Sequence, residues 1–186
     1  MVKASLKRKK KKWFEVKANI EPKSVVLGEV MAYELKEILN RRIIVSYDNI
    51  SNNPKDQKTK IEFMIVETKG SDGIAKPTAI YYQDSFIGQK IKRDKSRGLL
   101  VITEKSKDNK KIKMKIVFSV KSKIDRSINS ALIKNIESHF RDFIKSTNSD
   151  KLFSLEFVKR ETSGIKEKAR KIYPIDKLYV WKLSIV

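Results

Sequence analysis

The strongest constraint on the fold is a near-regular alternation of apolar and polar side chains over residues 111–121. A period of two predicts a β-strand with one face against a core and the other toward solvent. The predicted inner face holds Ile112, Met114, Ile116, Phe118 and Val120. The predicted outer face holds Lys111, Lys113, Lys115, Val117, Ser119 and Lys121. The sequence therefore predicts a sheet whose solvent face carries three successive lysines on one strand.

Further strands are expected mainly in the first two thirds of the chain, and helices mainly in the last third. Runs of β-branched and aromatic residues predict strands at 13–18, 42–47, 60–67, 78–82, 99–103 and 175–185. Apolar spacing and capping residues predict helices at 33–39, 128–144, 152–159 and 164–172, with Asp125 or Ser127 capping the second. Residues 51–56 are expected to form a loop, whereas 84–97 fits a helix or a loop. The prediction is an α+β fold, with a mostly antiparallel, barrel-like β-sheet and packed helices in the C-terminal third.

Six consecutive cations at residues 7–12 stand directly before Trp13 and Phe14. Their mutual repulsion prevents them from folding against one another and favours an external polyanion. We therefore expect a disordered basic arm over residues 1–12 and a single domain over 13–186. Of the 186 residues, 43 are Lys or Arg and 22 are Asp or Glu, which gives a formal net charge of +21. Only nine of the cations are Arg, and this bias favours contacts with phosphates over the reading of bases.

The sequence offers little for catalysis. It has no Cys, which excludes disulfides and thiolate metal sites, and its one histidine, His139, lies on the flank of the predicted helix stripe. Neither a phosphate-cradling glycine loop nor a cluster of carboxylates occurs. We therefore expect no enzyme activity, catalytic residue, cofactor, metal or small-molecule substrate. Since no apolar stretch could cross a bilayer and no secretory signal is present, we expect a cytoplasmic protein without a membrane partner.

Basic residues gather in three segments besides the arm. Any one such segment is usually a solvated face, but together, at this net charge, they predict a phosphate-binding surface with several sides. Trp13, Tyr81, Tyr82 and Tyr173 can stack on unpaired bases or pack in the core, and Trp13 can equally anchor the arm to the body. The predicted RNA-binding residues are Lys7, Arg8, Lys9, Lys10, Lys11, Lys12, Trp13, Lys90, Lys92, Arg93, Lys95, Arg97, Lys110, Lys111, Lys113, Lys115, Lys168, Arg170 and Lys171.

Three motifs in series carry a resemblance to a known family. They are KKWFEVKA at 11–18, RIIVSYDNI at 42–50 and KARKIYPIDKLYVWKLSIV at 168–186, with Gly28-Glu29 between the first two. In order and spacing they resemble the archaeal and eukaryotic small-subunit ribosomal protein family S3Ae, also called eS1. The last motif is similar to the family's ending, in which Lys-x-Ile-Tyr-Pro-Leu leads into a basic terminal strand. The chain resembles archaeal rather than eukaryotic members, and residues 84–97 are only loosely similar.

The resemblance implies a ribosomal protein, a structural constituent of the small subunit that takes part in translation as a ribonucleoprotein. It implies binding to small-subunit rRNA in the platform region near the mRNA exit, neighbouring platform proteins as partners, and a barrel-like body. Two alternatives remain open. A free nucleoid or RNA-chaperone protein would share the charge but not the ordered motifs, and an RNA-processing enzyme would need a base or metal site.

Overall fold

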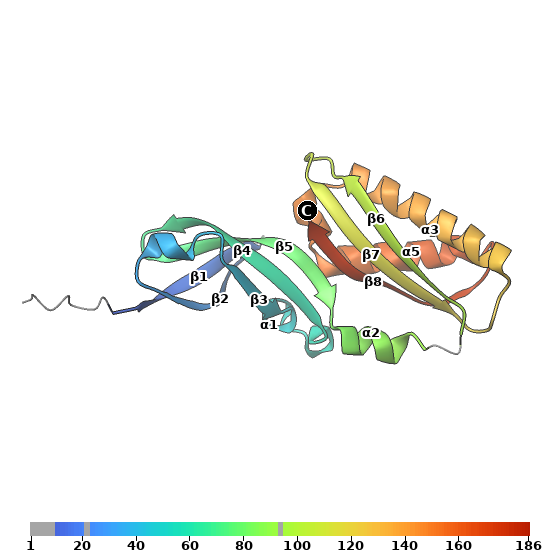
Figure 1. The fold of residues 1–186 in the computed structure, drawn as a ribbon, viewed down its shortest axis with the longest axis horizontal. Helices are drawn as coiled ribbons and strands as arrows, with labels where there is room; N and C mark the ends of the chain where they lie inside the picture. Colours follow the sequence, from blue (N-terminus) through green and yellow to red (C-terminus); the bar gives the residue numbers. More distant parts are fainter. Residues whose placement is uncertain (1–9, 21–22, 93–94) are drawn as a thin grey trace, which may run out of the picture. The chain divides into compact units, whose positions relative to one another are not determined.

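The computed structural model describes residues 10–20, 23–92 and 95–186, and Figure 1 shows the order of their strands and helices. The strands are β1 (Lys12–Ile20), β2 (Lys23–Ala32), β3 (Arg42–Ser46), β4 (Thr59–Lys69), β5 (Asp72–Tyr82), β6 (Arg97–Lys105), β7 (Lys111–Val120) and β8 (Ile175–Ile185). The α-helices are α1 (Asp48–Ser51), α2 (Asp84–Lys90), α3 (Arg126–Ser146), α4 (Ser149–Leu152) and α5 (Leu155–Ala169). Two short 3-10 helices are η1 (Leu35–Ile38) and η2 (Pro54–Asp56).

The described strands form one mixed sheet in the order β2-β1-β5-β8-β7-β6, with β3 paired to β4 and β4 to β5. The pairs β1–β2, β5–β8, β6–β7 and β7–β8 are antiparallel, whereas β1 and β5 run parallel. The predicted α+β class is therefore confirmed, but the predicted barrel is wrong because the sheet is not closed. The reason lies in β5, which pairs with β1 near Gly73 and with β8 near Ile80. The sheet branches along this strand, so it does not curl back on itself.

The chain divides into two compact units. The first unit contains the residues up to Val45 together with 62–76, and the second contains 46–61 together with 77–186. The strands β4 and β5 each contribute residues to both units.

The first unit packs the inward side chains of β1 and β4 around η1. Its centre is formed by four side chains that are 0% exposed, those of Val16, Ile38, Phe63 and Ile65. On the outer face of β1, the Nζ of Lys17 lies 2.7 Å from Asp72 Oδ2 and 2.9 Å from Glu15 Oε2. The hydrogen bond from Lys17 holds the pKa of Asp72 below its ordinary value, and the same bond raises the pKa of Lys17.

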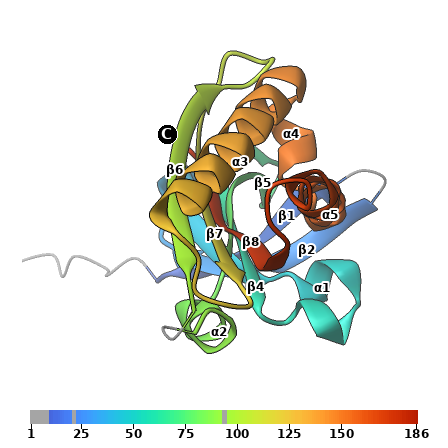
Figure 2. The same ribbon diagram turned by 90° about the vertical axis from the view of Figure 1, so that its right-hand side faces the viewer.

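The second unit packs α3 and α5 against one face of the sheet formed by β6, β7 and β8. Figure 2 shows α3, α4 and α5 on the same side of β6 and β7. The buried residues of α3 are Leu132, Ile136, Phe140, Phe143 and Ile144, which confirms the predicted stripe of this helix. The predicted inner face of β7 is also confirmed, because its members are all fully buried in the same core. The predicted solvent face is wrong for Val117 and Ser119, which are buried, and Val117 packs with Ile87 and Ile91. Asp125 stands at the N-cap of α3 as expected, although its side chain makes no capping hydrogen bond.

Several element boundaries differ from the prediction. The strand β2 was not predicted, because its apolar residues do not alternate cleanly across Gly28, whose φ is 144° and which adjoins a shift in register. The predicted loop at 51–56 contains the end of α1 and all of η2, and the helix expected at 33–39 is the shorter η1. The two helices expected at 152–159 and 164–172 are largely one helix, α5, which passes through Gly164. The first strand begins at Lys12, one residue before the predicted boundary, while residues 1–9 lie outside the described part.

Candidate nucleic-acid interface

The open face of the second unit's sheet carries the lysines that the alternation in β7 predicted. Lys111 and Lys113 are exposed, and they alternate with buried residues that face α3 and α5. The edge strand β6 lies beside them, with Lys105 opposite Lys111 and Thr103 opposite Lys113. The sequence predicted these lysines on the solvent face, and the pairing of β6 with β7 brings Lys105 beside Lys111.

A surface hollow gathers three of these cations at the end of the β6–β7 hairpin. It is lined by Thr103, Glu104, Lys105, Lys111 and Lys145, the last from the final turn of α3. We call the three cations Lys105, Lys111 and Lys145 the lysine hollow. Lys105 and Lys111 face each other across the strands, and like charges in that position repel. An anion placed among them would remove that repulsion.

The one carboxylate of the lysine hollow, that of Glu104, is already engaged by another residue. Arg141 of α3 donates from Nη1 to Glu104 and from Nη2 to Glu137, the second at 2.7 Å. The hydrogen bonds to Glu137 and Glu104 raise the pKa of Arg141. Within the described residues, no ion pair joins the lysine hollow to an acid. The hollow therefore retains its positive charge and can accept a phosphate.

Lys115, the next lysine along β7, is held differently. It is only half-exposed, and its Nζ lies 5.8 Å from the centre of the Trp181 ring. Opposite it on β8 stands Lys182, whose Nζ lies 5.5 Å from the centre of the Tyr81 ring. The negative ring faces offset part of the repulsion between the two cations. These residues form a row of alternating cations and aromatic rings across β5, β7 and β8.

The aromatic residues next to this row pack among themselves. Tyr82 of β5, Phe86 of α2 and Tyr179 of β8 have ring centres between 5.3 and 5.7 Å apart. Burial raises the pKa of Tyr82 to about 12, and it also raises the pKa of Tyr179. The indole Nε1 of Trp181 donates to Asp84 Oδ1 at 3.0 Å. Of the alternatives left open for Tyr81 and Tyr82, packing therefore accounts for Tyr82.

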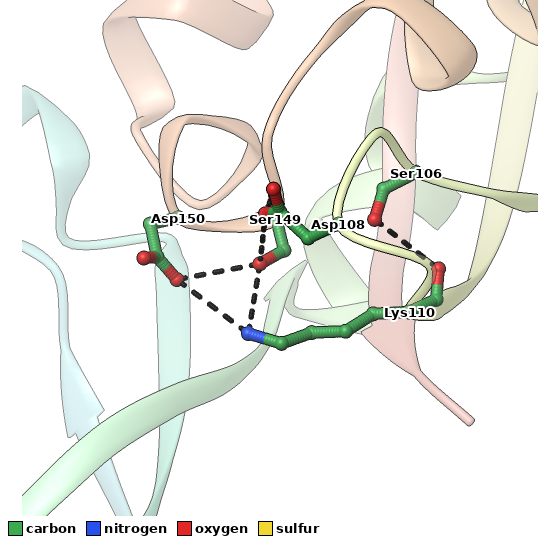
Figure 3. A network of polar contacts seen from close by, with 5 residues as sticks. All are labelled: Ser106, Asp108, Lys110, Ser149 and Asp150. Atoms are coloured by element: carbon green, nitrogen blue, oxygen red, sulfur yellow. Dashed lines mark hydrogen bonds and ion pairs between the residues drawn. The ribbon is translucent and has the colours of Figure 1, made fainter.

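Lys110, a predicted RNA-binding residue, is exposed, and its ammonium takes part in a network of side-chain contacts (Figure 3). Its Nζ donates to Ser149 Oγ at 2.9 Å and lies 3.9 Å from Asp150 Oδ1. Ser149, which is 0% exposed, donates from its backbone N and its Oγ to Asp108 Oδ2 at 2.8 and 3.1 Å. Asp108 thus caps α4 from the β6–β7 turn, where the N-cap residue Asn148 provides no side-chain bond.

Replacing Asp108 with alanine is expected to destabilise the protein by about 1–3 kcal/mol, because the buried Ser149 would lose the acceptor of two donors. Urea unfolding followed by circular dichroism measures this difference. Lys110→Gln serves as the control, because it leaves both Ser149 donors bonded to Asp108 and should cost less. Equal losses for the two variants would contradict the role given to Asp108.

The basic residues of the predicted segment at 90–97 have different surroundings in the structure. Lys90 ends α2 with its Nζ 5.6 Å from the centre of the Phe86 ring, and Lys95 lies 3.5 Å from Asp176 Oδ2. Lys92 and Arg97 are exposed, whereas Arg93 lies outside the described residues. Among the described residues of this segment, Lys92 and Arg97 are therefore the cations exposed to solvent.

The C-terminal basic segment lies across the sheet from the lysines of β7. Lys168, Arg170 and Lys171 are exposed at the end of α5, whose buried residues contact the opposite face of the sheet. The structure therefore does not bring this segment together with Lys111 and Lys113. Basic residues instead occupy more than one side of the second unit, as the sequence predicted.

The described end of the basic arm belongs to the first unit. Lys10, Lys11, Lys12 and Trp13 are all exposed, and the last two lie in β1. Lys7, Arg8 and Lys9 lie outside the described residues.

His139 is half-buried as expected, with its Nε2 3.4 Å from Glu161 Oε2 of α5. Among residues 10–20, 23–92 and 95–186, no group of three or more His, Cys, Asp or Glu could hold a metal ion. In that same part of the chain, no helix has both the length and the apolar character required to cross a membrane.

The structure adds Lys145 and Lys182, which the predicted site lacks. Lys145 lies far along the chain from Lys111, and it reaches the same hollow because α3 packs beside β6. Lys182 becomes relevant only through its register opposite Lys115. The spacing of charges in the sequence carried no signal for either residue, since both depend on pairing between distant segments.

Comparison with known proteins gives a consistent result. A family model described as the Ribosomal S3Ae family matches residues 3–186. The chain is similar to the small ribosomal subunit protein eS1 of Nanoarchaeum equitans, with 27% identity over 168 residues, covering 89% of this chain and 84% of the relative. It is similar to the protein of the same name from Staphylothermus marinus, with 23% identity, covering 97% and 85%. The corresponding protein of Methanocaldococcus jannaschii is 24% identical, covering 97% and 81%.

Proposed function

Because the chain belongs to the ribosomal S3Ae family, we propose that it is a structural constituent of the small ribosomal subunit and binds small-subunit rRNA. We place it in the platform region near the mRNA exit, beside neighbouring platform proteins, and hence in the cytoplasm. The family is structural and non-enzymatic, so the chain takes part in translation without catalysing a step. The similarity to proteins named small ribosomal subunit protein eS1 supports this role.

The observation that carries the rRNA-binding proposal is the lysine hollow. It brings three cations from β6, β7 and α3 to one concave surface, while Arg141 occupies the only carboxylate there. Lys acts as a flexible point charge on phosphate oxygens, and three such charges suit the backbone of a folded RNA. Lys113 extends this surface along β7.

The remaining predicted residues complete the proposal. Residues 13–186 act as one rRNA-binding body, and residues 1–12 act as a basic arm that lies between rRNA helices. Lys168, Arg170 and Lys171 contact phosphates from another side, because they lie across the sheet from the lysine hollow. A body with cations on several sides suits a protein surrounded by RNA, since each phosphate contact releases condensed counterions.

The proposal is tested with a tagged copy of the chain in archaeal cells and sucrose-gradient fractionation of their lysate. We expect the chain to be stoichiometric in small subunits and to remain there after a high-salt wash, because many simultaneous contacts must break together. Migration with chromatin or in free fractions would instead support a nucleoid or RNA-chaperone protein. A complementary measurement, crosslinking in cells, should recover small-subunit rRNA fragments attached to the lysine hollow.

A further inference from the structure

Three large side chains lie exposed together where the basic arm joins the first unit. Trp13 of β1 is 64% exposed, Met31 of β2 is 42% exposed and Tyr33, which follows β2, is 44% exposed. Trp13 and Met31 are direct cross-strand partners. The Nζ of Lys11 lies 5.4 Å from the centre of the Tyr33 ring. We call Trp13, Met31 and Tyr33 the aromatic platform.

The backbone register holds the aromatic platform on the solvent side. Val16, Ala18 and Ala32 are at most 2% exposed and face the core of the first unit. Side chains alternate along a strand, so Trp13 and Met31 must point to the opposite face. The sequence left two alternatives for Trp13, an anchor of the arm in the body and a surface for stacking. Because Trp13 is 64% exposed, the structure favours the stacking surface.

The run of six cations at residues 7–12 leads directly into the aromatic platform, and four acids, Glu15, Glu29, Glu34 and Glu37, also lie near it. Lys10 and Lys11 are exposed just before β1, whereas Lys12 is exposed at the pair with Ala32 on the other face. Arg41 donates from Nη1 to the Met31 carbonyl at 3.0 Å. Of the acids near it, Glu37 accepts the backbone N–H of Tyr33 at 3.0 Å. The second, Glu15, faces Lys17 at 2.9 Å. The third, Glu29, is exposed and stands opposite Glu15 on β2.

An exposed aromatic surface at the end of a basic run favours a ligand that combines aromatic rings with negative charge. Unpaired nucleotides have both, because each base presents a ring face and each linkage carries a phosphate. The core of a protein–protein interface is, by contrast, depleted in charged residues and Lys is rare there. The surroundings of Trp13 therefore favour RNA over a protein partner.

We propose that the aromatic platform stacks on unpaired bases of RNA, while the cations beside it contact the flanking phosphates. This inference rests on the proposed function and deepens it, because it assigns single-stranded rather than duplex RNA to this end of the first unit. In this proposal the cations of the arm contact phosphates, and Trp13 contacts bases.

The chain has two tryptophans, so each can serve as the only fluorescent reporter. In a Trp181→Phe protein, Trp13 fluorescence should be quenched by a short unstructured oligouridylate, with the same midpoint as binding measured by anisotropy of labelled RNA. In a Trp13→Phe protein, Trp181 should respond weakly, because its indole N–H is bonded to Asp84 and Lys115 lies over its ring.

Substitution adds a second readout. Trp13→Ala should weaken oligouridylate binding by about 5- to 100-fold, the loss of one stacked base, and should leave the salt dependence of affinity unchanged. Trp13→Phe should retain most of the affinity because it keeps an aromatic ring. Val26→Ala is the matched control, because Val26 is 54% exposed on the same β1–β2 hairpin but lies away from the arm.

Binding of oligouridylate without quenching of Trp13 would overturn the proposal. Unchanged RNA affinity of Trp13→Ala, together with its loss from small subunits in cells, would also overturn it and would assign the aromatic platform to a protein neighbour. Quenching in solution by a chain that never enters small subunits would support the stacking surface while contradicting the proposed ribosomal function. The two failures are therefore distinguishable.

Discussion

Replacing the three residues of the lysine hollow with glutamine is expected to weaken binding to small-subunit rRNA by roughly 100-fold at physiological salt. If each of these lysines neutralises one phosphate, a plot of log affinity against log salt concentration should lose about two to three units of slope. Filter binding of the full chain to the 3′ part of small-subunit rRNA, over a range of potassium concentrations, measures both quantities.

A matched variant separates this site from the effect of net charge. Lys36, Lys55 and Lys69 are exposed residues outside the hollow, and their replacement by glutamine removes the same charge. We expect this control to change affinity much less. Equal weakening by the two triple variants would show that the hollow is not a specific phosphate site. A loss of binding caused by unfolding would show as a lower stability of the triple variant of the hollow. We expect its stability to be unchanged or slightly higher, because the substitutions remove the repulsion between Lys105 and Lys111.

Long periodic segments of this fold were predictable from the sequence. Core positions lie two residues apart in β7 and mostly three to four residues apart in α3. The local pattern of apolar residues therefore predicts which side chains are buried against distant parts of the chain. The closing strand β8 was predicted at its observed bounds, although its buried residues Leu178, Val180 and Leu183 do not follow a strict period of two.

Other parts of the fold depend on pairing that no local pattern encodes. The strand β2 interrupts its own alternation at Gly28, where the register against β1 shifts. The branch in the sheet arises because β5 is long enough to pair with β1 and β8 in succession, and the composition of β5 gives no sign of this. A barrel was therefore a reasonable expectation from strand content alone, and it failed at the level of topology.

In the candidate site, too, some residues were predictable from a local pattern and others depend on contacts between distant segments. Lys111 and Lys113 were predictable from alternation in one strand, whereas Lys145 reaches them only through the packing of α3 against β6. Lys110 has the same charge and stands next to Lys111, yet its ammonium is hydrogen-bonded to Ser149 and lies near Asp150. Charge density along a sequence thus identifies a basic surface, but cross-strand register and burial decide which of its cations remain available to a phosphate.

Gly98→Ala is expected to be the most destabilising methyl addition among the described glycines, at about 3 kcal/mol. Gly98 on β6 stands directly opposite Phe118 on β7, and the Phe118 ring lies across it. A Cβ built at Gly98 would lie 2.5 Å from Cζ of that ring, far inside van der Waals contact. Because Phe118 is 0% exposed and packed in the core, the ring has no free space into which it could turn. Urea unfolding followed by Trp181 fluorescence, in a Trp13→Phe background, reports this change in the second unit.

The reason for the loss is testable by coupling the two positions. Gly164→Ala on α5 is the control, because nothing lies within 4 Å of its added Cβ, and it should be neutral or stabilise by about 0.5–1 kcal/mol. Phe118→Leu alone should destabilise by opening a cavity, but Gly98→Ala should cost less in that background, with a coupling of about 1–3 kcal/mol between the two changes. Additive losses would mean that the methyl group acts on the strand backbone and not on the ring. The absence of a side chain at Gly98 would then be unrelated to the Phe118 ring. The close pairing of β6 with β7, which shapes the lysine hollow, would need another cause.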